Sequence, residues 1–148
     1  MTNTINQFFT HDHHRLDDLF IQFQKAEKHE LQLELFQQFQ EGLTAHIEWE
    51  EQLLFPQIEQ AAGFPPHGGP THVMRMEHQQ IKECLSNIEQ AITQMQESKG
   101  SQQQLLNILS EHNIKEENIL YPLCDRLLAD ITKSEILDNI EPAKQLSA

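Results

Sequence analysis

One motif occurs twice in this chain of 148 residues and constrains its fold more than any other feature. Residues 46–56 and 112–122 both read His-x-x-x-Glu-Glu-x-x-Leu, followed by an aromatic residue and a proline. Residues four apart in a helix lie on one face, a turn apart, so each copy sets an imidazole beside a carboxylate. Two such helices facing one another would offer four ligands, which predicts a dinuclear metal centre inside a helix bundle.

The repeat extends upstream of each motif to an acid–histidine pair, found at residues 12–13 and 77–78. The histidines of these pairs, His13 and His78, lie 33 and 34 positions before the histidine of the motif that follows. The chain therefore reads as two similar helical hairpins in tandem, each with one histidine on its first helix and His-x-x-x-Glu on its second. The same register selects His13, because the neighbouring His14 is rotated away from the buried face.

Apolar residues recurring at three- and four-residue steps predict four long helices. The first covers residues 4–28, the second follows the polar stretch 28–30 and reaches Pro56, the third covers 71–97 and the fourth 101–130. The glycine- and proline-rich residues 63–70 form the loop between the hairpins. Four antiparallel helices with short connections predict an all-α, up-down-up-down four-helix bundle. We expect a single domain over 1–148, with its core at 4–130 and a short extra helix and polar tail at 131–148.

Local features predict where these helices bend, where they begin and what they bury. Because proline cannot donate a backbone N–H, Pro56 and its counterpart Pro122 should kink their helices or end them nearby. Ser101 and Gln104 match a capping box that begins the fourth helix. The expected inner faces include Phe9, Leu16, Phe20 and Phe23 on the first helix, Leu35, Phe39 and Leu53 on the second, Met95 at the end of the third, and Leu109, Ile119 and Leu123 on the fourth.

The bulk properties exclude several classes of function. With 10 basic and 23 acidic residues the formal net charge is −13, which disfavours binding to nucleic acid or to an anionic membrane. No leader pattern and no apolar run of membrane-spanning length occurs, and Cys84 and Cys124 form no disulfide or metal motif, so a cytoplasmic location is expected. No phosphate-binding glycine loop or nucleophile–base triad supports a nucleotide-dependent or hydrolytic enzyme.

The first glutamate of each motif, Glu50 or Glu116, requires a partner, because burying an unpaired carboxylate on an apolar face is costly. The predicted metal ligands are His13, His46, Glu50, His78, His112 and Glu116. Imidazole together with carboxylate suits iron, manganese or zinc. Two carboxylates that bridge two cations would leave two histidines for each metal, with open positions for water, a bridging oxygen or a small diatomic ligand.

These spaced motifs together resemble the hemerythrin-like (HHE cation-binding) family over residues 8–128, and residues 69–78 resemble the entry to its third helix. The resemblance implies a four-helix bundle that holds two non-haem iron ions bridged by carboxylates, with zinc or manganese as possible substitutes. The family's oxygen carriers have His-x-x-x-His on the third helix, where this chain has Met74 before His78, and His-x-x-x-x-Asp on the fourth, where it has Glu116 and Glu117. Oxygen transport is therefore disfavoured.

The set of four histidines and two glutamates is similar to that of the iron-centre repair proteins, which act on damaged iron–sulfur clusters and respond to nitric oxide. Those proteins typically carry an additional cysteine-bearing N-terminal segment, which is not in this sequence. We expect a di-iron protein that interacts with dioxygen, nitric oxide or peroxide as a sensor, scavenger or small redox catalyst. The alternatives are an iron store that donates iron to an apoprotein partner, iron–sulfur centre repair, and a structural bundle held together by metal.

Two further pairs of equivalent residues flank the predicted ligands. Glu51 and Glu117 follow the ligand glutamates and are expected to lie either behind the metal ligands, without contacting the metal, or at the surface. Phe55 and Tyr121 occupy matching positions, so their rings are expected to be structural. The hydroxyl of Tyr121 would either bond to a ligand or reach solvent.

Overall fold

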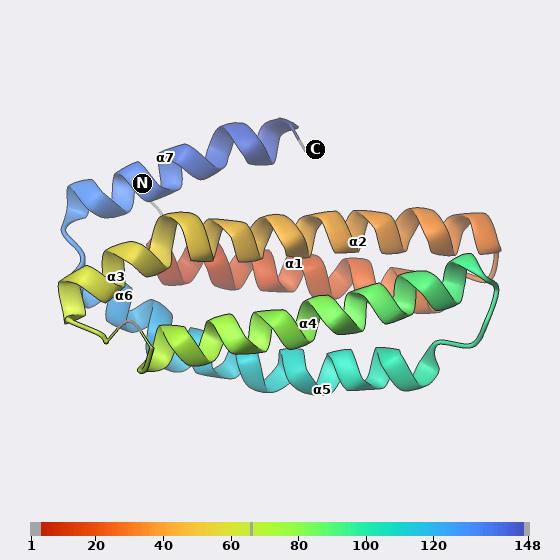
Figure 1. Cartoon of the computed structure of the whole chain (residues 1–148). Coiled ribbons are helices and arrows are strands. Elements are labelled where there is room, and N and C mark those ends of the chain that lie inside the picture. Colours follow the sequence, from red (N-terminus) through yellow and green to blue (C-terminus); the bar gives the residue numbers. More distant parts are fainter. Residues whose placement is uncertain (1–3, 66, 147–148) are drawn as a thin grey trace.

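The computed structural model describes residues 4–65 and 67–146, and side chains up to residue 140. Every regular element in these segments is helical. The four long helices are α1 (Ile5–Lys25), α2 (His29–Trp49), α4 (Pro70–Thr93) and α5 (Lys99–Lys115). They run alternately up and down, with α1 and α2 forming one hairpin and α4 and α5 the other (Figure 1). The predicted all-α, up-down-up-down bundle is confirmed.

Both motif helices continue through one wide turn into a short helix. The π-turn η1 (Glu50–Leu54) joins α2 to α3 (Phe55–Ala62), and η2 (Glu116–Leu120) joins α5 to α6 (Tyr121–Leu127). A proline is the second residue of α3 and of α6, and its ring and missing N–H disturb the turn before it. Where a kink or an end of the helix was predicted at each proline, the structure has a π-turn closed by hydrogen bonds five residues apart.

The π-turns change which residues face the core. Leu54 and Leu120 are almost fully buried, whereas Ile119 is 60% exposed and Leu53 is half-buried. A π-turn holds more residues than an α-turn, so the third residue after each ligand glutamate rotates outward and the fourth and fifth face inward. The prediction of Ile119 as a core residue is therefore wrong by one position, whereas Leu53 is partly buried and still packs against the apolar core.

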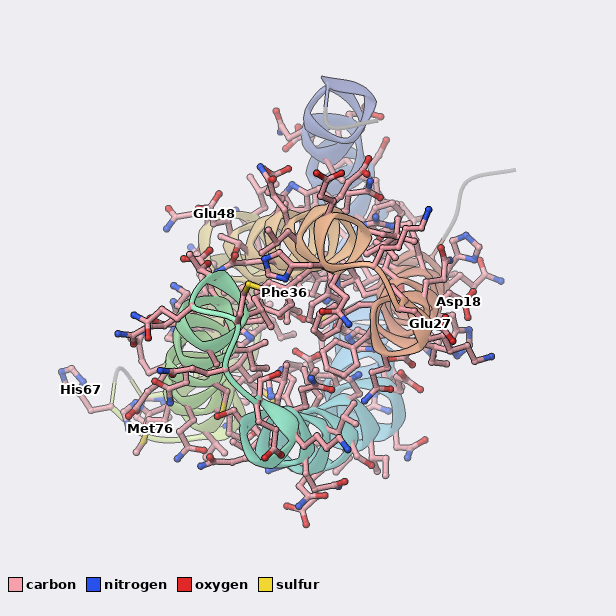
Figure 2. The ribbon with its side chains drawn as sticks, turned by 90° about the vertical axis from the view of Figure 1, so that its right-hand side faces the viewer. Asp18, Glu27, Phe36, Glu48, His67 and Met76 are labelled. Carbon is pink, nitrogen blue, oxygen red and sulfur yellow. The ribbon has the colours of Figure 1, made fainter. Side chains whose placement is uncertain are left out.

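Two apolar clusters fill the bundle on either side of a polar layer. The α7 cluster is named after the C-terminal helix α7 (Asp130–Leu146) and lies at the end near α3 and α6. It contains Ile5, Phe8, Phe9, Trp49, Leu54, Phe55, Ile58, Met74, Leu120, Tyr121, Cys124, Leu128, Ile136, Leu137 and Ile140. The distal cluster lies toward the α1–α2 connection and contains Leu16, Phe20, Phe23, Phe36, Phe39, Leu43, Ile47, Ile81, Cys84, Leu85, Ile88, Ile92, Leu105 and Leu109. Seen from that end, Phe36 points between the helices while Glu48 and Met76 point outward (Figure 2).

The ends of several helices differ from expectation. The C-terminal helix α7 (Asp130–Leu146) is longer than predicted, takes up most of the expected polar tail, and runs outside the four main helices (Figure 1); residues 147–148 of that tail lie outside the described residues. Helix α5 begins after Ser98, so the capping box predicted at Ser101 is wrong. Helix α4 ends at Thr93, which leaves Met95 with a positive φ and 75% exposed rather than buried.

The inner face of α1 is as predicted, with its apolar residues and His13 buried. On α2, Phe36, three residues before Phe39, takes the fully buried position, and the predicted Leu35 is half-buried and packs against the distal cluster. Leu123 on α6 is half-buried and packs against the α7 cluster. These differences in which apolar residues face the core do not affect the buried histidines, which lie at one level along the bundle.

Candidate metal centre

The polar layer between the two clusters consists of the six side chains that the repeat singles out. None is more than 3% exposed. They are His13 on α1, His46 on α2, Glu50 at the start of η1, His78 on α4, His112 on α5 and Glu116 at the start of η2. On each helix the next turns on either side belong to the α7 cluster and the distal cluster. The fold thus brings all six together at one level of the bundle.

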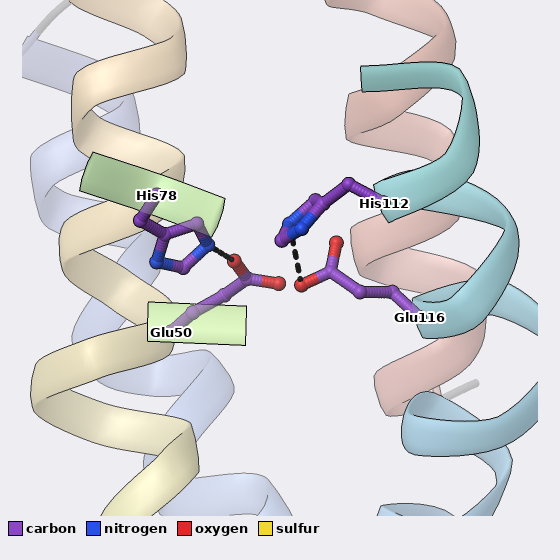
Figure 3. A group of neighbouring side chains, drawn as sticks. All are labelled: Glu50, His78, His112 and Glu116. Carbon is purple, nitrogen blue, oxygen red and sulfur yellow. Dashed lines mark ion pairs between the residues drawn. The ribbon is translucent and has the colours of Figure 1, made fainter. Parts of the chain in front are cut away.

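One half of the layer consists of Glu50, His78, His112 and Glu116. His78 Nε2 lies 3.0 Å from Glu50 Oε1, and His112 Nε2 lies 3.2 Å from Glu116 Oε2. Figure 3 shows the two pairs facing one another across the bundle, with both carboxylates pointing inward. One donor atom from each of the four residues lies within 4.8 Å of the others, close enough to surround a single metal ion.

The other half uses the remaining oxygens of the same carboxylates. His13 Nε2 lies 3.1 Å from Glu116 Oε1, and His46 Nε2 lies 3.5 Å from Glu50 Oε2. His13, His46 and Glu116 also form a group of donors within 4.8 Å. Each glutamate therefore offers one oxygen to each histidine pair, which is the arrangement needed to bridge two cations.

Three buried atoms of the first half have no hydrogen-bond partner: Glu50 Oε1, His78 Nε2 and Glu116 Oε2. The first two are close to one another, yet they are not aligned for a hydrogen bond. Buried polar atoms left unpaired are rare and cost about 1–3 kcal/mol each. A cation between these donors would satisfy all three, so the donor set fits a metal ion.

The other nitrogen of each histidine faces a carboxylate from a neighbouring helix. The four contacts are His13 Nδ1 to Glu117 at 2.7 Å, His46 Nδ1 to Asp12 at 2.9 Å, His78 Nδ1 to Glu51 at 2.6 Å and His112 Nδ1 to Glu77 at 2.8 Å. We call these four acids the outer carboxylates. They hold the rings so that every Nε2 points into the layer, as carboxylates do behind metal-binding histidines. Because each contact joins adjacent helices, the four link the helices into a ring.

Two of the outer carboxylates had no role in the sequence analysis. Asp12 and Glu77 are the acids of the repeated acid–histidine pairs, and each serves the histidine of the following motif rather than its own neighbour. Asp12 also accepts a hydrogen bond from Arg15 at 2.7 Å, and Glu77 pairs with Lys115. Their repetition before each histidine was the signal, but the partner becomes evident only once the helices are packed.

The hydroxyl of Tyr121 lies inside the second half of the layer. It is positioned to donate to Glu50 Oε2 at 2.6 Å and to Glu116 Oε1 at 2.9 Å. In a regular α-helix the residue five positions after Glu116 points about 140° away from it, and the π-turn η2 brings Tyr121 back onto the ligand face. Of the two expected alternatives for this hydroxyl, bonding to a ligand is therefore the one observed.

The charges of the layer shift its protonation strongly. Burial alone lowers the pKa of His46, but the charge of Glu50 and the hydrogen bond and charge of Asp12 outweigh it and raise the pKa to about 10. His78 behaves alike, with Glu50 raising its pKa to about 9. Burial raises the pKa of Tyr121 well above its usual value, and the nearby glutamate charges raise it further. In the metal-free protein at neutral pH, protons on His46 and His78 therefore offset the negative charge of the carboxylates, and a metal has to displace these protons.

An antiparallel four-helix bundle with a buried layer of histidines and glutamates defines a cation-binding helical domain. The hemerythrin HHE cation binding domain matches residues 4–124, and the chain belongs to this family. The iron-sulfur cluster repair protein YtfE of Escherichia coli O81 (strain ED1a) is 31% identical over 132 residues, which cover 76% of this chain and 60% of that protein. Its counterpart from Escherichia fergusonii is 30% identical over the same shares.

A DNA nickase from Nostoc sp. (strain PCC 7120) is 30% identical over 110 residues, or 74% of this chain but only 30% of that protein. The chain thus spans less than two thirds of the curated relatives it matches. No solved structure matches it significantly. Among the described residues, no helix is both long enough and apolar enough to cross a membrane.

Proposed function

We propose that the chain is a non-haem di-iron protein. One iron would be held by His78 and His112, the other by His13 and His46, and the carboxylates of Glu50 and Glu116 would bridge the two. This proposal is carried by one observation: in both Glu50 and Glu116, one carboxylate oxygen faces the first histidine pair and the other oxygen faces the second. Zinc or manganese would fit the same nitrogen and oxygen donors.

The site favours reactions with small molecules. Iron bound here would supply open coordination positions and redox chemistry toward dioxygen, nitric oxide or peroxide. The apolar clusters exclude bulk water on both sides of the layer. On the α1–α5 side, Glu117 lines a surface groove of about 510 Å³ and contacts His13 of the layer, so its carboxylate lies between the groove and that histidine. We propose a sensor, scavenger or small redox role.

Iron donation or iron–sulfur centre repair is the second candidate. It is supported by the relatives named iron-sulfur cluster repair protein, of which this chain covers 60%. It requires labile iron, whereas the first candidate requires a centre that survives a chelator while its spectrum responds to added ligand. A metal that only holds the helices together would show neither property.

The buried, unpaired Cys84 and Cys124 support a reducing, cytoplasmic location. The net charge of −13 supports a partner other than nucleic acid or an anionic membrane. A small diatomic or peroxide ligand, or an apoprotein that accepts iron, fits both properties.

The test is iron analysis and optical spectroscopy of anaerobically reconstituted protein, before and after adding dioxygen, nitric oxide or peroxide. We expect iron in the wild type, a spectral change with at least one ligand, and loss of most iron in His46→Gln. His14→Gln is the matched control, because His14 is exposed and lies outside the layer. Wild-type protein that takes up no iron, or His46→Gln protein that keeps all of it, would overturn the proposal.

A further inference from the structure

The two halves of the repeat differ at a position that places an oxygen atom in the polar layer of one half and not of the other. Phe55 and Tyr121 both lie five residues after a ligand glutamate, both begin the helix after a π-turn, and both are fully buried. Phe55 stacks on His78, with ring centroids 5.8 Å apart and planes 6° from parallel. Tyr121 lies 5.7 Å from His13 and adds an oxygen that Phe55 lacks. The two halves of the layer are therefore chemically unequal.

The Tyr121 oxygen contacts every donor of its half of the layer. It lies 2.6 Å from Glu50 Oε2, 2.9 Å from Glu116 Oε1, 3.2 Å from His13 Nε2 and 3.3 Å from His46 Nε2. With metal–ligand bonds of about 2.0–2.2 Å, ligands at right angles to one another lie about 3 Å apart. The distances from the Tyr121 oxygen to the four donors are therefore similar to those between neighbouring ligands of one metal ion.

The unpaired atoms of the layer show the same asymmetry. All three belong to the His78 and His112 half, where the matching aromatic residue is a phenylalanine. In the other half, the Tyr121 hydroxyl contacts each of the four donor atoms. The hydroxyl has one proton to donate to a carboxylate oxygen, and its oxygen can accept from the imidazole nitrogens, so in the metal-free layer this one atom links all four donors of its half.

We propose that the oxygen of Tyr121 is a fifth protein ligand of the metal position formed by His13 and His46. The His78 and His112 position then keeps four protein ligands, and exogenous small ligands bind there, beside Phe55. Phenolate oxygen is an established ligand of protein-bound iron. Coordination releases the hydroxyl proton to solvent on loading, as metal binding does for other protein ligands. This inference rests on the proposed di-iron centre and adds a role for a residue outside the six predicted ligands.

The chain makes the test unambiguous, because Tyr121 is its only tyrosine. Ferric protein loaded with iron should show phenolate-to-iron charge-transfer absorption, and resonance Raman spectra should contain ring modes that shift when the protein is made with deuterated tyrosine. In Tyr121→Phe both signals should disappear while most of the iron remains, since the six other ligands are intact. Tyr121→Phe protein with full iron and an unchanged spectrum would overturn the ligand assignment.

The reciprocal variant tests the asymmetry. In Phe55→Tyr the new oxygen should occupy the open position, and azide, used as the exogenous probe, should bind at least tenfold more weakly than to the wild type. In Tyr121→Phe azide binding should persist or gain a second event. If the wild type shows the tyrosinate signal but binds azide at the tyrosine-bearing iron, the placement of the open position is wrong. Failure of the wild type to load iron would instead refute the di-iron proposal.

Discussion

Asp12 is the most buried of the outer carboxylates, and its replacement by asparagine gives the sharpest test of how these acids support the centre. Asp12 is 1% exposed, compared with 17–29% for Glu51, Glu77 and Glu117. It contacts His46 Nδ1 at 2.9 Å and accepts a hydrogen bond from Arg15. Asp12→Asn keeps the shape of the side chain and removes its charge.

Asp12→Asn should lower both the stability of the metal-free protein and its affinity for metal. Burial alone raises the pKa of Asp12, but the hydrogen bond and charge of His46, followed by those of Arg15, lower it from 3.8 to about 2. At about 1.4 kcal/mol per unit, that charge stabilises the metal-free protein by about 2 kcal/mol at neutral pH. Loss of a carboxylate behind a metal-binding histidine also weakens metal binding by about 10–100-fold. For the more exposed Glu117, solvent screening should keep the loss at or below about tenfold.

The assay is competition for iron with a chelator at pH 7, alongside urea unfolding of chelator-treated protein, for the wild type, Asp12→Asn and Glu117→Gln. The lowered pKa gives the sign: the stability difference is present above pH 3.8 and shrinks as the pH falls through about 2. Iron affinity in Asp12→Asn equal to the wild type, or a larger loss in Glu117→Gln, would refute the reasoning.

Three further predictions follow from the same geometry. Leu120→Ala should lower the free energy of unfolding by about 2–5 kcal/mol and Ile119→Ala by less than about 0.5 kcal/mol, because the π-turn buries only the first; equal losses in urea unfolding would contradict that register. Metal-free protein should lose stability as the pH rises from 6.5 through the raised pKa values of His78 and His46, about 9 and about 10; constant stability over that range would contradict the proton balance. Removing iron should lower the wild-type Tm and leave that of His46→Gln nearly unchanged, which differential scanning calorimetry would detect.

Much of the architecture follows from the repeat. A spacing of 33 and 34 residues between histidines requires two hairpins of equal length, and equal hairpins place their histidines at one level. The buried positions of His13 and His78 were accessible from periodicity alone, because α1 and α4 are regular helices at those points. The exposure of His14 follows from the same periodicity.

The errors lie where a helix departs from regular geometry or where its neighbour decides the outcome. Assuming 3.6 residues per turn through the prolines placed Ile119 inside and gave Tyr121 no defined position, although Pro122 signalled the irregular turn. The role of Asp12 depends on how α1 is rotated against α2, which no local pattern determines. The extent of α7 depends on the α7 cluster, to which Ile136 and Ile140 contribute.

Mössbauer spectroscopy combined with iron analysis tests the central claim most directly. For anaerobically loaded and then oxidised protein, we expect two irons per chain whose spins are coupled, because Glu50 and Glu116 would each bridge both positions of the proposed centre. Glu50→Ala should weaken or abolish that coupling, whereas Glu48→Ala, which changes an exposed residue on α2, should leave it intact. One iron per chain, or two that are magnetically independent, would contradict a carboxylate-bridged di-iron centre.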